Sequence, residues 1–244
     1  MAKESGLGDR LFVSGYDLSG DSNDVQITAN TATLDMTGLP DGATARDGGI
    51  RDSTISWKSY WNTTGAHPVL SALPTSNIYV TYCRSTLLGA PAFAHRAVQI
   101  GYDPKRGNDG ALAMDVETVG AQYAGDWGVQ LTAGARTDTA ATNGASVHDA
   151  GAATAFGAQA YLQLIGCTAT ATTKIVIQDS PDNATWNDLV EFTPVVTGSA
   201  PLGERVTVTG NVDEYVRVIT TTTGAITSVQ FEVMIVRNEF AVTP

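Results

Sequence analysis

The sequence predicts an all-β fold, and three features of the chain lead to this prediction. Helical periodicity is nearly absent from the 244 residues, whereas short runs of alternating apolar and polar residues are frequent. Clusters of Gly, Pro, Asn and Asp separate these runs, as turns separate strands. Apolar residues make up 43% of the chain, so a chain of this length can build its core without disulfides or metal ions.

Two segments in the first half of the chain have strand patterns. Residues 54–61 alternate, with Ile55 and Trp57 on one face and Lys58 on the other. Residues 78–83 are almost all β-branched or aromatic. Both segments are predicted to be strands.

Residues 97–102 and 111–117 are predicted to form a long β-hairpin around a charged turn. The sequence between them, DPKRGNDG, contains Pro, two Gly and an Asn-Asp step, which are typical of turns. Apolar residues alternate along both arms. The residues of this candidate hairpin are Val98, Ile100, Tyr102, Asp103, Lys105, Arg106, Asp109, Leu112, Met114, Asp115, Val116 and Glu117.

Two segments are candidates for a short helix. In His67–Leu73, Pro68 occupies a position that the first turn of a helix allows. The second candidate is Pro91–Val98. Both are shorter than an isolated stable helix, so helix is expected to be a minor part of the fold.

A change of composition predicts two domains. Residues 134–157 are rich in Gly, Ala and Thr and contain few large apolar residues, so we expect a linker or an extended arm there. The domains on either side are a β domain of residues 1–133 and a small β-sandwich of residues 158–244.

The second domain carries the clearest strand signals. Strict alternation of Val229, Phe231, Val233 and Ile235 predicts a half-buried antiparallel strand. Short strands separated by turns at this density are typical of a sandwich. The expected strands are 158–165, 174–178, 205–209, 214–220 and 228–237.

The charge balance limits the class of partner. The net charge is −11, from 25 acidic and 14 basic residues, and no basic stripe or tail is present. Sequence-specific nucleic-acid binding, which needs a cationic surface, is therefore not expected, although an acidic wall could repel DNA phosphates. The first ten residues contain no apolar segment and no run approaches ~18 apolar residues, so we expect neither a signal peptide nor a membrane span.

Residues with catalytic or metal-binding potential are few and scattered. His67, His95 and His148 lie in no motif of a nucleophilic enzyme, and no Cys-x-x-Cys, His-x-x-x-His or phosphate-loop pattern occurs. We therefore expect no enzyme, cofactor or metal site, although a hydrolase with paired carboxylates stays a distant alternative. Cys83 and Cys167 lie in apolar strand-like runs and are expected to be buried free thiols.

Two groups in the second domain have both a functional and a structural interpretation. The oxygen-rich group Asp179, Asp182, Asn183 and Asp188 could bind calcium, but these are also ordinary turn residues, and we favour the turn. Trp186 and Tyr215 could form a surface platform for a sugar or act as core anchors, and we favour the core.

The C-terminal pattern resembles a β module of phage virion proteins. It runs KIVIQDSPDNATWNDLVEF, GERVTVTG, EYVRVITTTT and FEVMIVRNEF, and the N-terminal half adds MAKESGLG, YDLSGD, LDMTG, GGIRDSTISW and HPVLSALP. Together these motifs resemble the major tail tube proteins of siphoviruses of the actinobacterial type, with a C-terminal immunoglobulin-like module. The resemblance covers nearly the whole chain.

This resemblance implies a fold, an assembly and a location. The fold would be a tail-tube-like β-barrel or sandwich with one short helix and a long hairpin, followed by the small β-sandwich. Hexameric rings would stack into a tube, with six hairpins forming a barrel around a lumen through which DNA passes during ejection. Partners would be the chain itself and the tape measure, terminator and distal tail proteins. The protein would be assembled in the host cytoplasm and located in the virion tail.

Two other functions are consistent with the same residues. A capsid decoration protein would also be a weakly charged β-sandwich protein. A glycan- or receptor-binding tail module would use the second domain.

Overall fold

The chain is built almost entirely from β-strands in a computed structural model that describes residues 5–72, 76–144 and 146–240. Among these residues there is one short helix, α1 (Ala66–Leu70), and no sheet closes into a barrel. The all-β prediction with one short helix is confirmed. The strands are β1 (Arg10–Val13), β2 (Tyr16–Asp17), β3 (Ser22–Asp35), β4 (Arg46–Tyr60), β5 (Ile78–Cys83), β6 (Pro91–Arg106), β7 (Leu112–Gly120), β8 (Asp126–Gln130), β9 (Arg136–Asp138), β10 (Val147–Asp149), β11 (Ala158–Ala169), β12 (Thr173–Ser180), β13 (Asn187–Glu191), β14 (Leu202–Val208), β15 (Tyr215–Thr222) and β16 (Ile226–Arg237).

The chain divides into two compact units. Unit 1 contains residues 1–20, 79–94 and 127–244, and unit 2 contains residues 21–78 and 95–126. Strand β6 begins in unit 1 and ends in unit 2. The division of the sequence into 1–133, 134–157 and 158–244 stays a prediction. No helix among the described residues has the length and apolarity to cross a membrane.

Unit 2 contains the antiparallel strand order β3-β4-β7-β6, and β6 is also paired with β5 and β8 in the same twelve-stranded sheet. The alternation predicted for residues 54–61 is confirmed, because β4 buries every second side chain from Ser53 to Ser59. The β6–β7 pairing confirms the predicted hairpin, with Ala97 opposite Gly120 and Arg106 opposite Leu112. The neighbouring pairs on the buried face are Ile55 with Thr118, Trp57 with Val116 and Ser59 with Met114.

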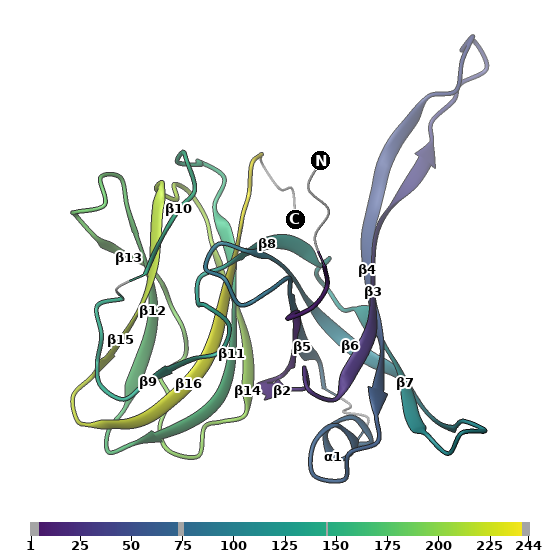
Figure 1. Cartoon of the computed structure of the whole chain (residues 1–244). Coiled ribbons are helices and arrows are strands. Elements are labelled where there is room, and N and C mark those ends of the chain that lie inside the picture. Colours follow the sequence, from purple (N-terminus) through teal and green to yellow (C-terminus); the bar gives the residue numbers. More distant parts are fainter. Residues whose placement is uncertain (1–4, 73–75, 145, 241–244) are drawn as a thin grey trace. The chain divides into compact units, whose positions relative to one another are not determined.

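Most of unit 1 is a sandwich of two sheets. One sheet contains β14, β11 and β16, with β9 paired to β16, and the other has the order β10-β15-β12-β13 (Figure 1). Inward-facing residues such as Leu162, Ile177, Val218 and Phe231 form one apolar core between them. All five strands predicted within residues 158–237 are present, each with ends shifted by a few residues.

A second apolar cluster in unit 1 lies on the other face of β11 and β16. It joins Phe12 of β1 and Cys83 of β5 to Tyr161 and Met234. Cys83 and Cys167 are both free and buried, as predicted. The turn between β1 and β2 is fixed here by Gly15, whose N–H donates to Gln163 Oε1 at 2.7 Å.

The prediction of a helix at Pro91–Val98 is wrong, since these residues form the first half of β6. Ala92, Phe93, Ala94 and His95 are all buried in succession, so both faces of the strand are covered. Alanine has the highest helix propensity, but propensities differ by less than about 1 kcal/mol per residue among ordinary residues, and packing on two sides outweighs that preference. The other candidate, His67–Leu73, overlaps α1, although Leu73 lies outside the described residues.

The prediction that the strand at residues 228–237 is half-buried is also wrong in part. Val229, Phe231, Val233 and Ile235 face the sandwich core, as the alternation indicates. The opposite face is buried as well, because Glu232 and Met234 have no exposed surface. Strand β16 therefore lies between two apolar clusters, and Glu232 occupies a buried position.

Residues 134–157, predicted as a linker or arm, contain two short strands. Strand β9 pairs with β16 and strand β10 pairs with β15, so this segment contacts both sheets of the sandwich. Most of its side chains are at least partly exposed, in keeping with its small-residue composition. Residues 1–4, which begin the MAKESGLG motif, and residues 73–74 of HPVLSALP lie outside the described residues.

Candidate functional site

The candidate hairpin residues lie on β6 and β7 and in the turn between these strands. Met114 and Val116 are buried, whereas Asp103, Lys105, Arg106 and Asp109 are exposed. The alternation on β6 is interrupted by a bulge between Gln99 and Gly101, which leaves Ile100 56% exposed. The structure thus confirms the hairpin, and the role of its residues in assembly stays a prediction.

An acidic groove lies on the face of this sheet opposite to the buried one. It has a volume of about 260 Å³ and is lined by Asp24, Asp103, Asp115 and Glu117, with Lys58 as the one cation among its lining residues. Asp103 and Asp115 are direct partners across β6 and β7. Like charges in this position repel each other and give the face a negative field.

The sheet of unit 2 ends in an edge strand of unusual composition. Strand β3 pairs only with β4 among the described residues, and residues 25–34, VQITANTATL, contain no charge and no proline. The edge strands of unit 1 are shorter and carry charges, as in Glu204 and Arg205 of β14 or Asp188 and Glu191 of β13. Charges on an edge prevent pairing with another chain, and the β3 edge lacks this protection.

A network of buried polar groups holds the centre of the same sheet. His95 Nε2 donates to Thr118 Oγ1 at 3.1 Å, since the Thr118 hydroxyl itself donates to Ile55 O at 2.9 Å. His95 Nδ1 then accepts from the Ser53 hydroxyl at 3.1 Å, and Ser53 Oγ accepts from Gly125 N–H at 2.9 Å. Burial lowers the pKa of His95 to about 4.

This Ser–His pair resembles the hydrogen bond that nucleophilic enzymes use. However, Ser53 is only 1% exposed and His95 is fully buried, so a substrate cannot reach either group. The network instead connects β4, β6 and β7. We assign this network a structural role at the base of the β3–β4 and β6–β7 hairpins.

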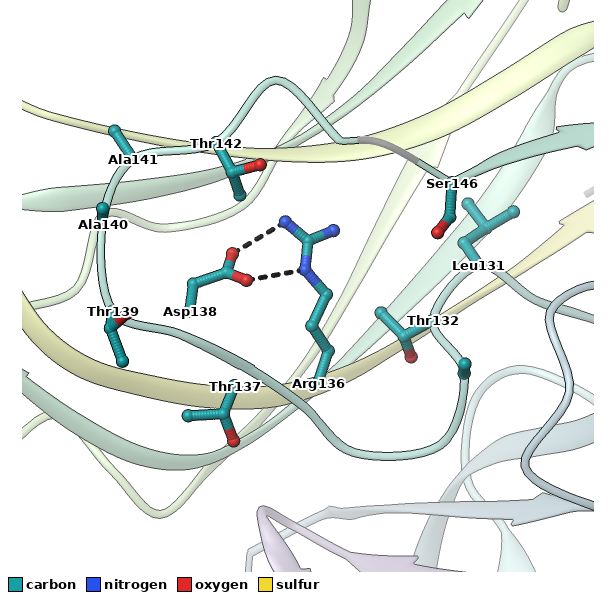
Figure 2. A pocket seen from close by; sticks show the side chains of 11 residues that line it. Leu131, Thr132, Arg136, Thr137, Asp138, Thr139, Ala140, Ala141, Thr142 and Ser146 are labelled. Carbon is teal, nitrogen blue, oxygen red and sulfur yellow. Dashed lines mark hydrogen bonds and ion pairs between the residues drawn. The ribbon is translucent and has the colours of Figure 1, made fainter.

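A pocket of about 490 Å³ in unit 1 is lined mainly by threonine and alanine from residues 131–146 (Figure 2). The guanidinium of Arg136 and the carboxylate of Asp138 face each other at its centre and form two hydrogen bonds, at 2.8 and 2.7 Å. Arg136 also donates to Val218 O, and Asp138 accepts from the Thr220 hydroxyl. The two charges pair with each other and bond to groups of β15. The pair therefore stabilises the packing of this segment on β15 and does not present an unpaired charge to a ligand.

Trp186 and Tyr215, the candidate surface or core residues, are half-buried. The Arg217 guanidinium lies 4.0 Å from the centre of the Trp186 ring and donates to Gln178 Oε1. Nearby Glu214 and Asp149 raise the pKa of the Tyr215 hydroxyl. One face of Trp186 is therefore covered by a cation, which leaves less of the ring for a sugar.

In the candidate calcium-binding group, Asp182 and Asn183 lie in the turn between β12 and β13, whereas Asp179 lies on β12 and Asp188 on β13. Asp182 accepts hydrogen bonds from the N–H groups of Thr185 and Ala184, which lower the pKa of its carboxyl to about 2. Asp179 points elsewhere and accepts from Asp213 N–H. Within the described residues, no three acidic, histidine or cysteine side chains are grouped to hold a metal ion.

Glu232 is a functional candidate that the sequence did not reveal. Its carboxyl is fully buried on β16, Cys83 Sγ lies 3.7 Å from Oε1, and Oε2 has no hydrogen-bond partner among the described residues. Burial raises its pKa to about 8. The alternation of apolar and polar residues along β16 predicted that Glu232 faces solvent, so no sequence signal indicated that it is buried.

Comparisons with known proteins give distant structural similarities. No protein-family model and no curated protein matches the chain. Among solved structures, it is similar to a chain from the virion of a native gene transfer agent (GTA) particle. The identity is 12%, covering 51% of this chain and 98% of that chain, with a TM-score of 0.43.

Two further solved structures are similar at comparable levels. One is from the tail of an empty GTA particle with C6 symmetry, at 14% identity, 52% and 98% coverage, and a TM-score of 0.41. The other is the Dit protein of phage SPP1, described as a hub adsorption apparatus protein, at 11% identity, 94% and 99% coverage, and a TM-score of 0.32. At these identities and TM-scores the similarities carry no argument about what this chain does.

Proposed function

We propose that this chain is a structural subunit of a phage tail, and that its copies form the stacked hexameric rings of the tail tube. The observation that carries the proposal is the long, uncharged and unpaired edge of β3 in unit 2. Such an edge is an aggregation hazard in a monomer, whereas pairing with another copy removes the hazard. The solved structures named above come from virion, tail and hub proteins, and the proposal does not rest on them.

The strand order of unit 2 suits closure into a ring. The order β3-β4-β7-β6 contains an even number of antiparallel strands and ends in two different strands, β3 and β6. Since β6 is also paired with β5 and β8, only the part of β6 beyond those pairings is available to another copy. When copies are repeated around an axis, β6 of one copy therefore lies antiparallel to β3 of the next. This head-to-tail contact uses two different surfaces, so it continues to add copies instead of stopping at a dimer, and it gives a ring when the rotation between neighbours closes.

The acidic groove would form the inner surface of the ring, where the DNA passes. With Asp103, Asp115 and Glu117 facing the lumen, the wall would repel phosphates, so DNA would slide without sequence-specific binding. In this proposal residues 158–244 form an outer immunoglobulin-like module in the virion tail. Tape measure, terminator and distal tail proteins would contact the ends of the tube.

Substitution on the β3 edge tests this function directly. We expect the purified chain to form rings or tubes in negative-stain images and sedimentation, and Thr28→Lys to reduce assembly at least tenfold, because a lysine on an edge strand blocks pairing. The matched control is Thr207→Lys, on the edge strand β14 of unit 1, which should assemble like the wild type. Persistent wild-type monomers at high concentration, or normal assembly of Thr28→Lys, would contradict the proposal.

A further inference from the structure

The hairpin of β3 and β4 extends well beyond the sheet of unit 2. Pairing between β4 and β7 stops at Thr54 and Val119, whereas pairing between β3 and β4 continues to Asp35 and Arg46. The additional eight residues of β4 correspond to about 26 Å at the usual rise of a strand. We call residues 29–52 the distal ribbon, and Figure 1 shows it projecting from the rest of unit 2.

The distal ribbon has no core of its own. Every described side chain in it is exposed, on both faces of the ribbon, apart from the half-buried Gly49. A two-stranded ribbon without a packing face is marginally stable in water. Its end also carries large apolar side chains that are 50–106% exposed, namely Leu34, Met36, Leu39 and Ile50. These features indicate a surface that becomes covered in an assembly.

The two ends of unit 2 carry complementary charges. The tip of the distal ribbon carries Asp35, Asp41 and Asp47, with Arg46 as the one cation among residues 34–50. The β6–β7 turn lies at the opposite end of the same sheet (Figure 1) and contains Lys105 and Arg106, with Asp109 as the one acid among residues 104–112. These are the only consecutive basic residues in a chain of net charge −11.

The basic end is also free to make contacts. Lys105 and Arg106 are exposed and form no ion pair among the described residues. Tyr60 and Leu112, which flank this turn, are 51% and 36% exposed. Each end of unit 2 thus has exposed apolar residues, and the charge at residues 34–50 is predominantly negative, whereas residues 104–112 carry two cations and one acid.

We propose that the distal ribbon of one copy docks on the Lys105–Arg106 turn of a second copy in the adjacent ring, so that this contact joins successive rings. The inference rests on the proposed ring-forming function and assigns its axial interface. A contact between opposite ends of identical subunits repeats without limit, which is what a tube requires. Acidic and apolar groups on the ribbon meet basic and apolar groups on the turn, so the second copy supplies both kinds of partner.

Charge exchange between the two ends tests the contact. The full chain is compared with the variants Lys105→Glu/Arg106→Glu and Asp41→Lys/Asp47→Lys, and with the combination of all four substitutions. All four positions are exposed, so the fold should tolerate them. Lys174→Glu, at an exposed position on the otherwise mostly buried strand β12 of unit 1, serves as the control for a Lys-to-Glu change. Tube length is measured by negative-stain microscopy.

We expect wild type and Lys174→Glu to give tubes, each two-site variant to give single rings, and the four-site combination to recover at least half of the wild-type tube length. Tubes of wild-type length from both two-site variants would overturn the axial contact while leaving the ring-forming function standing. Single rings from the four-site combination would also overturn the pairing of these two ends. Wild-type chain without any rings would overturn the proposed function, and this inference with it.

Discussion

Gly15 occupies the most constrained turn of unit 1. Its φ is +87°, and a Cβ at this position would collide with Leu164 O and Leu202 N. The backbone can approach β11 and β14 this closely only because glycine has no side chain.

We therefore expect Gly15→Ala to destabilise the protein by about 3 kcal/mol or more, since overpacking adds to the backbone strain. The matched control is Gly210→Ala, with φ +91° and no atom within 4 Å of the added Cβ, which should cost only ~1 kcal/mol. Chemical denaturation of both variants measures the difference. Equal losses would show that the close approach at Gly15 does not constrain the fold.

Glu232 should make stability depend on pH. Burial raises the pKa of its carboxyl from 4.5 to about 8, so the folded chain retains a proton that the unfolded chain releases. Stability should therefore fall as pH rises from about 4.5 to 8, and the loss is complete above the folded pKa.

Replacement of Glu232 by glutamine should remove this component. We expect the melting temperature of Glu232→Gln to fall less than that of the wild type between pH 5 and pH 8, as measured by thermal unfolding. Glu191→Gln, at an exposed ion pair, is the control and should follow the wild type. A Glu232→Gln curve parallel to the wild-type curve would mean that the buried carboxyl is ionised in the fold.

At the scale of single residues, the sequence predicted burial where alternation is regular. Met114 and Val116 are buried as their pattern indicates, but Ile100 is exposed because a bulge shifts the register of β6. The His95 network and Glu232 could not be predicted, since their partners lie on other strands. Polar residues on a strand predict a solvent-exposed face only where no other element packs against that face.

At the scale of elements, strands with one apolar face were the easiest to predict. Strand β3 was missed because both of its faces are exposed over most of its length, so it has no hydrophobic periodicity. The first half of β6 was predicted as helix for the opposite reason, since both of its faces are buried. The missed strand β3 supplies the edge and one of the two strands of the distal ribbon, on which the two proposals depend.

At the scale of the whole molecule, the alternating runs and the turns between them predicted an all-β chain but not how its segments group. Unit 1 combines β1, most of β5 and the start of β6 with strands that follow residue 126, so segments far apart in sequence share one compact unit. Such grouping follows from strand pairing, which a local pattern does not encode. The open sheet of unit 2 is therefore evident only in three dimensions.

The central claim is that unit 2 completes its sheet through identical copies of the chain. A cryo-electron-microscopy map of the purified, assembled chain tests it most directly. We expect a closed ring in which β3 of each subunit is hydrogen-bonded antiparallel to β6 of its neighbour, with Asp103, Asp115 and Glu117 facing the channel. An assembly in which the β3 edge faces solvent, or a sample containing only monomers, would contradict the claim.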